Sequence, residues 1–161
     1  SVIAGVLKNA IPDVNLVSAP FVAKERDIKI SITNQDKSGA FEGYLKVTVV
    51  TEQRERSIAG TVFSDGKPRF IQIKGINIDA EIGQHMLYTT NKDSPGVIGI
   101  LGQIMGVNGV NIANFTLGRA REGGEAIALL HADQQVDENV VKELSSTGVF
   151  QQIKPLKFDP G

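Results

Sequence analysis

The sequence predicts a mixed α+β fold in two domains. Two observations carry this prediction. The spacing of apolar residues changes from about 3.6 to about 2 at Asp27, and after Gly83 a complete series of strands and helices begins again. We expect residues 1–83 to form an α/β sandwich with an antiparallel sheet, and residues 84–161 to form a second domain. A chain of 161 residues is long enough for two small domains, each with a modest core.

The first domain is predicted to begin with two short helices. Val2, Val6 and Leu7 have helical spacing, which ends before Pro12 because proline disfavours helix in the residue before it. Pro20 suits the first turn of a second helix. Strands are expected where apolar residues alternate or β-forming residues cluster, at 28–32, 45–49, 57–63 and 70–74. Segment 75–83 is interpreted as the seam between the domains.

The second domain is predicted to follow the order strand, helix, strand, strand, helix, strand. The expected strands are 86–90, 110–117, 125–132 and 149–156, and the expected helices are 97–105 and 136–144. Asp137 is the predicted N-cap of the second helix. This order is that of a ferredoxin-like two-layer sandwich.

Composition excludes several classes of function. The formal net charge of -1 gives no field that would recruit nucleic acid or an anionic bilayer. No apolar run approaches the ~20 residues of a membrane span, so we expect a cytoplasmic protein. With no Cys and two His, neither a thiolate nucleophile nor a metal cage is expected. Because Ser1 stands inside an apolar run without an initiator Met, we interpret the chain as a fragment of a longer protein.

One motif carries a family resemblance. Asn91-Lys92-Asp93-Ser94-Pro95-Gly96-Val97, leading through a helix to Gly109-Val110-Asn111-Ile112, resembles an ACT domain, an amino-acid-sensing module, over about residues 85–158. Together with segments 13–20 and 23–26, the chain resembles the C-terminal regulatory half of long-form D-3-phosphoglycerate dehydrogenase. The resemblance implies an allosteric substrate-binding domain at 1–83 and an ACT domain at 84–161.

The resemblance also implies function and partners. L-serine, or a related amino acid, would bind between two ACT domains paired side by side in a homodimer, with a homotetramer as an alternative. Asn91 and Asp93 of one chain would then meet Asn111 of the other. The chain itself would have no catalytic residues and no cofactor. NAD, and the oxidoreductase step that begins L-serine biosynthesis, would belong to the catalytic domains of the parent.

Physical chemistry supports the same site. The helix that opens after Pro95 offers unpaired N–H groups for a carboxylate, and Asp93 offers a partner for an ammonium group. Gly96 has no Cβ to keep a ligand from the backbone. The candidate ligand-binding residues are Asn91, Asp93, Ser94, Pro95, Gly96, Val97, Asn111 and Ile112. The alternative is structural: Asp93-Ser94 caps a helix with Pro95 at its first position, and Asn111 satisfies backbone groups.

A second, weaker candidate is an anion site in the first domain. The residues are Arg54, Arg56, Lys67, Arg69 and Lys74, which lie on or near consecutive β segments. The resemblance implies a phosphorylated substrate or another anion there. The alternative is a solvated strand face.

Three other kinds of function are alternatives to this interpretation. The chain could instead be the regulatory part of a bacterial L-serine dehydratase, or a non-catalytic amino-acid-binding module of another enzyme. RNA binding is disfavoured because strand 125–132 carries no stacking aromatic residue. Catalysis is disfavoured because we find no nucleophile–base pair.

Overall fold

The structure is a computed structural model that describes residues 2–8, 10–33 and 43–159. It separates into two compact units, 1–42 and 43–161. Both sheets formed by the described residues lie in the second unit. The predicted domain boundary after residue 83 falls in the connection between the fourth and fifth strands, and the division into 1–83 and 84–161 stays a prediction.

The first unit contains two short helices, as predicted. They are α1 (Val2–Lys8) and α2 (Ala19–Glu25), with Pro20 in the first turn of α2. One small cluster of buried side chains forms the core of this unit. Its members are Ala4, Leu7, Val14, Ala19 and Ala23. Before α2, the Asn15 side chain accepts hydrogen bonds from the N–H groups of Val17 and Ser18, which fixes the entry into the helix.

The strand predicted at 28–32 is wrong. These residues form no regular strand, and the Ile32 side chain is 83% exposed. Alternation alone does not make a strand, because the backbone N–H and C=O groups need a neighbouring strand to pair with. Residues 10–33 of the same unit contain no other strand that could supply this partner.

Sheet A is an antiparallel meander of four strands in sequence order. Its strands are β1 (Leu45–Val50), β2 (Glu55–Val62), β3 (Pro68–Ile73) and β4 (Ile76–Glu81). The first three confirm the predicted strands, whereas β4 was not predicted and occupies most of the segment 75–83, within which the seam between the domains was placed. Lys74 and Gly75, both with positive φ (54° and 80°), form a two-residue hairpin turn instead of a linker.

Sheet B has the ferredoxin-like order β6-β7-β5-β8, and all its neighbouring strands are antiparallel. Its strands are β5 (His85–Lys92), β6 (Ile112–Arg119), β7 (Glu125–Ala132) and β8 (Phe150–Lys157). Helices α3 (Val97–Val107) and α4 (Glu138–Ser146) complete the predicted βαββαβ order. Asp137 is the N-cap of α4, and its side chain accepts hydrogen bonds from the N–H groups of Asn139 and Val140.

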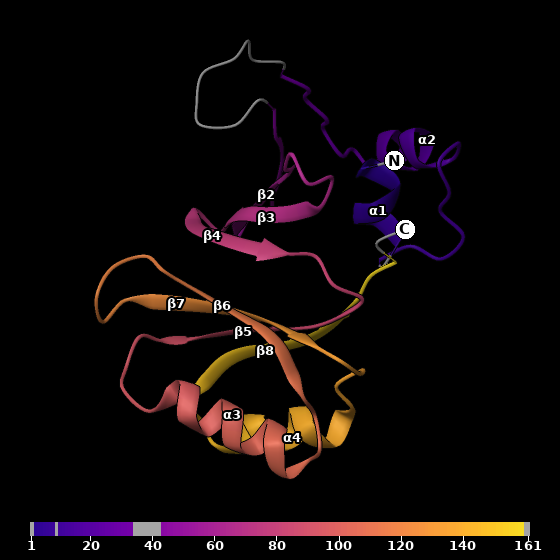
Figure 1. Ribbon diagram of the computed structural model, residues 1–161. Helices are drawn as coiled ribbons and strands as arrows, with labels where there is room; N and C mark the ends of the chain where they lie inside the picture. Colours follow the sequence, from indigo (N-terminus) through magenta and orange to yellow (C-terminus); the bar gives the residue numbers. More distant parts are fainter. Residues whose placement is uncertain (1, 9, 34–42, 160–161) are drawn as a thin grey trace. The chain divides into compact units, whose positions relative to one another are not determined.

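The second unit has three layers, with α3 and α4 on one face of sheet B and sheet A on the other (Figure 1). Residues of β5 alternate between the two cores: Leu87 packs toward the helices and Met86 toward sheet A. Gly118 of β6 lets β4 approach closely, since an added Cβ would lie 2.7 Å from the carbonyl oxygen of Asn77. The mixed α+β prediction is therefore confirmed.

Candidate functional site

The predicted amino-acid site lies where β5 ends and α3 begins. Asn91 is only 3% exposed, and its Nδ2 donates to the carbonyl oxygen of Lys92 at 2.8 Å. The space between this segment and the sheet is a small cavity of about 40 Å³. Its polar lining residues are Thr89, Asn91, Asp93 and Ser94, and its apolar ones are Val97, Ile98, Leu101, Phe115, Leu117, Ala126, Ala128 and Phe150. The site is thus narrow, with apolar walls and a few polar groups at its edge.

Helix α3 begins without a side-chain cap. Its N-cap is Gly96, in the left-handed region at φ 90°, so the capping role considered for Asp93 and Ser94 is wrong. The Ser94 hydroxyl instead donates to the carbonyl oxygen of Lys92 at 3.3 Å. An added Cβ at Gly96 would meet nothing within 4 Å, so glycine is needed there for its backbone conformation and not for space. The first N–H groups of α3 are consequently available to an acceptor.

Asp93 is already held by its own chain. Its Oδ2 accepts hydrogen bonds from Arg119 Nη1 at 3.0 Å and from the Gly123 N–H at 3.2 Å. Its backbone N–H donates to the carbonyl oxygen of Gly124, which ties the segment before α3 to the β6–β7 hairpin. The Arg119 hydrogen bond, followed by that from Gly123, holds the pKa of Asp93 below its ordinary value. The carboxylate therefore stays ionised at neutral pH.

Asn111 lies at the opposite end of the same sheet. Its neighbour Ile112 pairs with Ala132 of β7, whereas Arg119 and Asn91 both pair with Ala126. Six positions along β7 separate these rows, which is about 20 Å at about 3.3 Å per residue. Within one chain, the structure therefore does not bring Asn111 to Asn91 and Asp93.

The Asn111 side chain also has a partner in its own chain. Its Nδ2 donates to Asp133 Oδ2 at 2.6 Å, and its backbone carbonyl accepts from the Asp133 N–H at 3.2 Å. Asn111 is nevertheless exposed, and Ile112 beside it packs against the helix-side core. The carboxamide is thereby fixed at the start of the edge strand β6.

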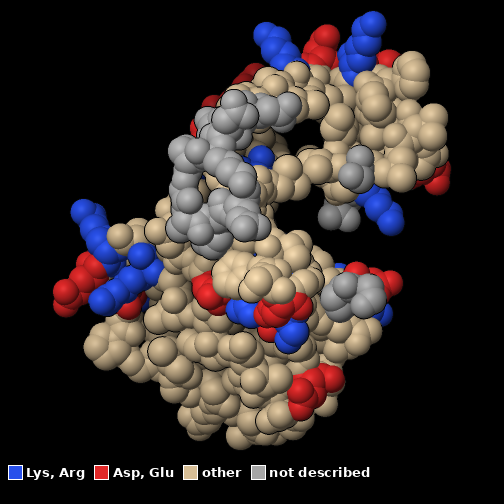
Figure 2. Space-filling view, turned by 45° about the horizontal axis from the view of Figure 1, so that its top comes forward, with Lys and Arg blue, Asp and Glu red and all other residues tan. Residues whose placement is uncertain are grey.

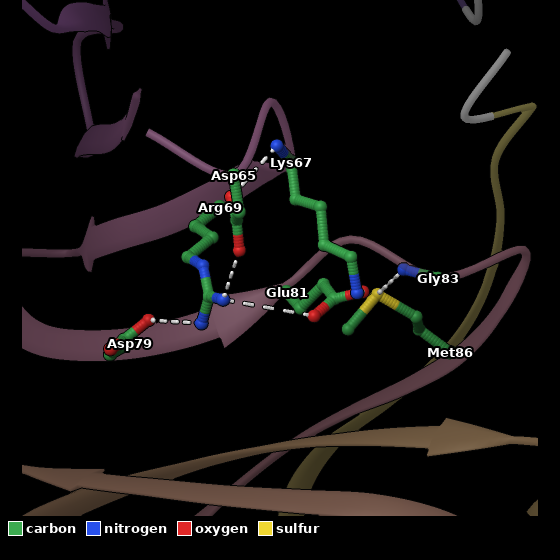
Figure 3. A network of polar contacts seen from close by, with 7 residues as sticks. All are labelled: Asp65, Lys67, Arg69, Asp79, Glu81, Gly83 and Met86. Carbon is green, nitrogen blue, oxygen red and sulfur yellow. Dashed lines mark hydrogen bonds and ion pairs between the residues drawn. The ribbon is translucent and has the colours of Figure 1, made fainter. Parts of the chain in front are cut away.

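Two cations of the predicted anion site are neutralised by acidic neighbours (Figure 3). Lys67 Nζ lies 2.7 Å from Glu81 Oε1. Arg69 contacts Asp65 Oδ2 at 3.1 Å and Asp79 Oδ1 at 3.3 Å. On the face shown in Figure 2, basic and acidic side chains likewise lie next to one another. This part of sheet A therefore presents balanced ion pairs.

The other three cations are spread over the sheet. Lys74 forms an ion pair with Glu125 of β7, which joins sheet A to sheet B. Arg56 donates to the carbonyl oxygen of Glu55 at 3.4 Å, and Arg54 is exposed at the turn before β2. These contacts do not bring the five cations into one pocket. That they bind an anion stays a prediction.

Two further findings concern metals and membranes. Among the residues that the structure describes, no group of three His, Asp or Glu side chains is arranged to hold a metal ion. No helix in the described ranges is long and apolar enough to cross a bilayer.

Comparison with known proteins supports the resemblance found in the sequence. Residues 1–74 match the family model of the D-3-phosphoglycerate dehydrogenase intervening domain. D-3-phosphoglycerate dehydrogenase of Bacillus subtilis (strain 168) is 34% identical over 147 residues, which are 91% of this chain. This chain is related to D-3-phosphoglycerate dehydrogenases. The enzymes of the same name from Synechocystis sp. and Methanocaldococcus jannaschii are 31% and 32% identical over 89% and 81% of the chain.

The chain spans only about a quarter of the length of these dehydrogenases, from 25% to 28% of each. The similarity nevertheless extends over most of the chain, well beyond the matched intervening domain. It therefore includes residues of the ferredoxin-like part as well as those of the first 74.

Sequence reasoning missed two residues at the site. Arg119, which holds Asp93, lies between the predicted strands 110–117 and 125–132, and Thr89, which lines the cavity, lies inside the predicted strand 86–90; neither is among the predicted site residues. Their places depend on how β5, β6 and β7 pair, and a charge of opposite sign to Asp93 was the only local signal for Arg119.

Proposed function

We propose that this chain is the regulatory part of a D-3-phosphoglycerate dehydrogenase, in which an ACT domain binds L-serine or a similar small amino acid between two paired copies. The observation that carries the proposal is the uncapped, positively polarised start of α3, which lies beside the ionised carboxylate of Asp93. A free amino acid at neutral pH carries both charges that such a pair of groups would bind.

The acceptor and donor groups suit a zwitterion. The N–H groups at the start of α3 would take the ligand carboxylate. Among the described contacts, Asp93 uses only Oδ2, which leaves Oδ1 for the ligand ammonium group. Asn91, nearly buried beside them, would complete the polar edge of the site.

Pairing of two copies is supported by the edges of sheet B. One edge strand, β8, carries exposed Lys154, Pro155 and Lys157, which oppose the addition of a further strand. The other edge strand, β6, has neither Pro nor Lys, and its Leu117 side chain is 42% exposed. Self-association would therefore occur through β6.

Antiparallel pairing through β6 would also assemble the site. The start of one β6 strand would then lie beside the end of the other. Asn111 of one copy would come next to Arg119 of its partner, and Arg119 is the residue that holds Asp93. The distance of about 20 Å that separates Asn111 from Asp93 within one chain is thus removed by a second copy.

The wider role rests on the relatives. In this proposal residues 1–83 form the allosteric substrate-binding domain, and the NAD-dependent reaction belongs to other parts of the parent enzyme. The reported relatives are dehydrogenases, which favours that parent over an L-serine dehydratase.

A complementation experiment tests the shared site. Asn111→Ala and Asp93→Ala are prepared separately, and L-serine binding is measured by calorimetry for each variant and for their mixture. Each variant alone should bind at least tenfold more weakly than the wild type. Their mixture should regain wild-type affinity at a reduced number of sites, because a mixed dimer has one site with neither substitution. No recovery in a mixture shown to contain mixed dimers would refute a site built from two chains.

The interface is tested by adding charge to each edge of sheet B. Leu117→Lys on β6 should turn the wild-type dimer into a monomer, because an edge lysine opposes strand pairing. Gln151→Lys on β8 is the matched control and should leave the dimer intact. The measurement is sedimentation equilibrium with and without L-serine. If only the β8 variant dissociates the dimer, the interface lies at β8 and the proposed pairing through β6 is refuted.

A further inference from the structure

Thr89 carries an unused hydroxyl at the floor of the cavity. It lies in the middle of β5, is 0% exposed, and has no hydrogen-bond partner for Oγ1. Its pairing with Ala128 places it on the helix side of sheet B, the face that also carries Leu87 and Asn91. The same residue lines the cavity under the start of α3.

A buried hydroxyl without a partner destabilises a folded protein, and valine would fill the same space without that cost. Asn91, Asp93 and Ser94 also line the cavity, but none of them forms a hydrogen bond with Oγ1, and the other lining residues are apolar. The cavity of about 40 Å³ has room for a few water-sized groups, and not for a long side chain. A small ligand group that is itself polar would satisfy Oγ1.

We infer that Thr89 is the specificity-determining residue of this site: its Oγ1 forms a hydrogen bond with the side-chain hydroxyl of the bound amino acid. The site therefore selects a small hydroxylated amino acid over one of the same size without a hydroxyl. This inference rests on the proposed function, since it assigns the ligand's side chain to the cavity whose edge binds its carboxylate and ammonium groups.

Thr90 provides a matched control. It is the next residue in the same strand, it is 1% exposed, and its Oγ1 also has no partner. Thr90 pairs with Ile127, which belongs to the core against sheet A, so it lies on the opposite face and outside the cavity. The two threonines differ mainly in which face of sheet B they occupy.

The test compares three variants by calorimetry with L-serine and L-alanine. The wild type should bind L-serine about tenfold more tightly than L-alanine, the effect of one net hydrogen bond. Thr89→Val should lose this preference through weaker L-serine binding, with L-alanine binding unchanged. Thr89→Ser and Thr90→Val should keep it. Both valine variants should melt at or above the wild-type temperature without ligand, because each removes an unpaired buried hydroxyl.

The outcomes separate the two hypotheses. If the wild type binds both amino acids equally, or if Thr89→Val keeps the preference for L-serine, the role of Thr89 is refuted while the proposed function stands. If Thr90→Val loses the preference as fully as Thr89→Val, the effect is not local to the cavity and the inference also fails. If the wild-type dimer binds no amino acid, the proposed function fails and the inference fails with it.

Discussion

Replacing Gly118 by alanine should loosen the contact between the two sheets. An added Cβ would lie 2.7 Å from the carbonyl oxygen of Asn77 and 3.0 Å from Cγ2 of Ile76, whereas ordinary contact begins at 3.4 Å. Strand β4 would have to retreat by about 0.7 Å, and its backbone cannot move aside as a flexible side chain can. Overpacking of this kind costs about 2 kcal/mol in free energy of unfolding.

Thermal unfolding measures this cost. For a unit of this size, about 2 kcal/mol corresponds to a melting temperature lower by about 8 °C. Gly102→Ala is the control: Gly102 lies inside helix α3, and an added Cβ there would meet nothing within 4 Å. That control should raise the free energy of unfolding by about 1 kcal/mol, because alanine favours the helix. A Gly118→Ala variant as stable as the wild type would show that β4 does not lie this close to β6.

Three further predictions concern single side chains. Asp137→Ala should lower the free energy of unfolding by about 1 kcal/mol in urea titrations, because α4 loses its N-cap. Lys74→Met should lower the free energy of unfolding by about 1 kcal/mol in the same assay, because it removes the ion pair with Glu125. Lys74→Asn removes the same ion pair but should lower the free energy of unfolding by less, because asparagine tolerates the positive φ of this position. Equal losses of stability in the two variants would contradict this prediction. The folded-state pKa of Asp93 is lowered, so its stabilisation is complete above pH ~4 and is lost as pH falls through that pKa. The stability difference between wild type and Asp93→Asn should therefore shrink in acid, and a difference independent of pH would rule out the ionised contact with Arg119.

The fold was predictable where local pattern and tertiary pairing agree. The helical spacing around Leu101 and the capping residue Asp137 indicate α3 and α4 directly, and the structure confirms both. Segment 28–32 alternates as a strand would, but the described part of its unit offers no strand to pair with. Strand β4 was missed for the opposite reason. Gly75 is compatible with a hairpin turn and with a linker, and only the pairing of β4 with β3 shows that it belongs to a turn.

The candidate site was predictable only in part for the same reason. The motif from Asn91 to Gly96 is contiguous, so its residues could be named from the sequence. Arg119 reaches Asp93 from a strand 26 residues further along the chain, and the face on which Thr89 lies is set by its pairing with β7. Long-range register of this kind leaves no local signal.

In the proposed dimer, the placement of Asn111 and Asp93 toward opposite ends of sheet B has a consequence for titrations. A site that needs one end from each of two chains does not exist in a solitary chain, so the apparent ligand affinity must weaken on dilution of the protein. Conversely, every ligand bound adds to the free energy that holds the two chains together. The fraction of occupied sites in the proposed dimer therefore depends on two concentrations, that of the protein and that of the amino acid, and both act through the pairing of β6.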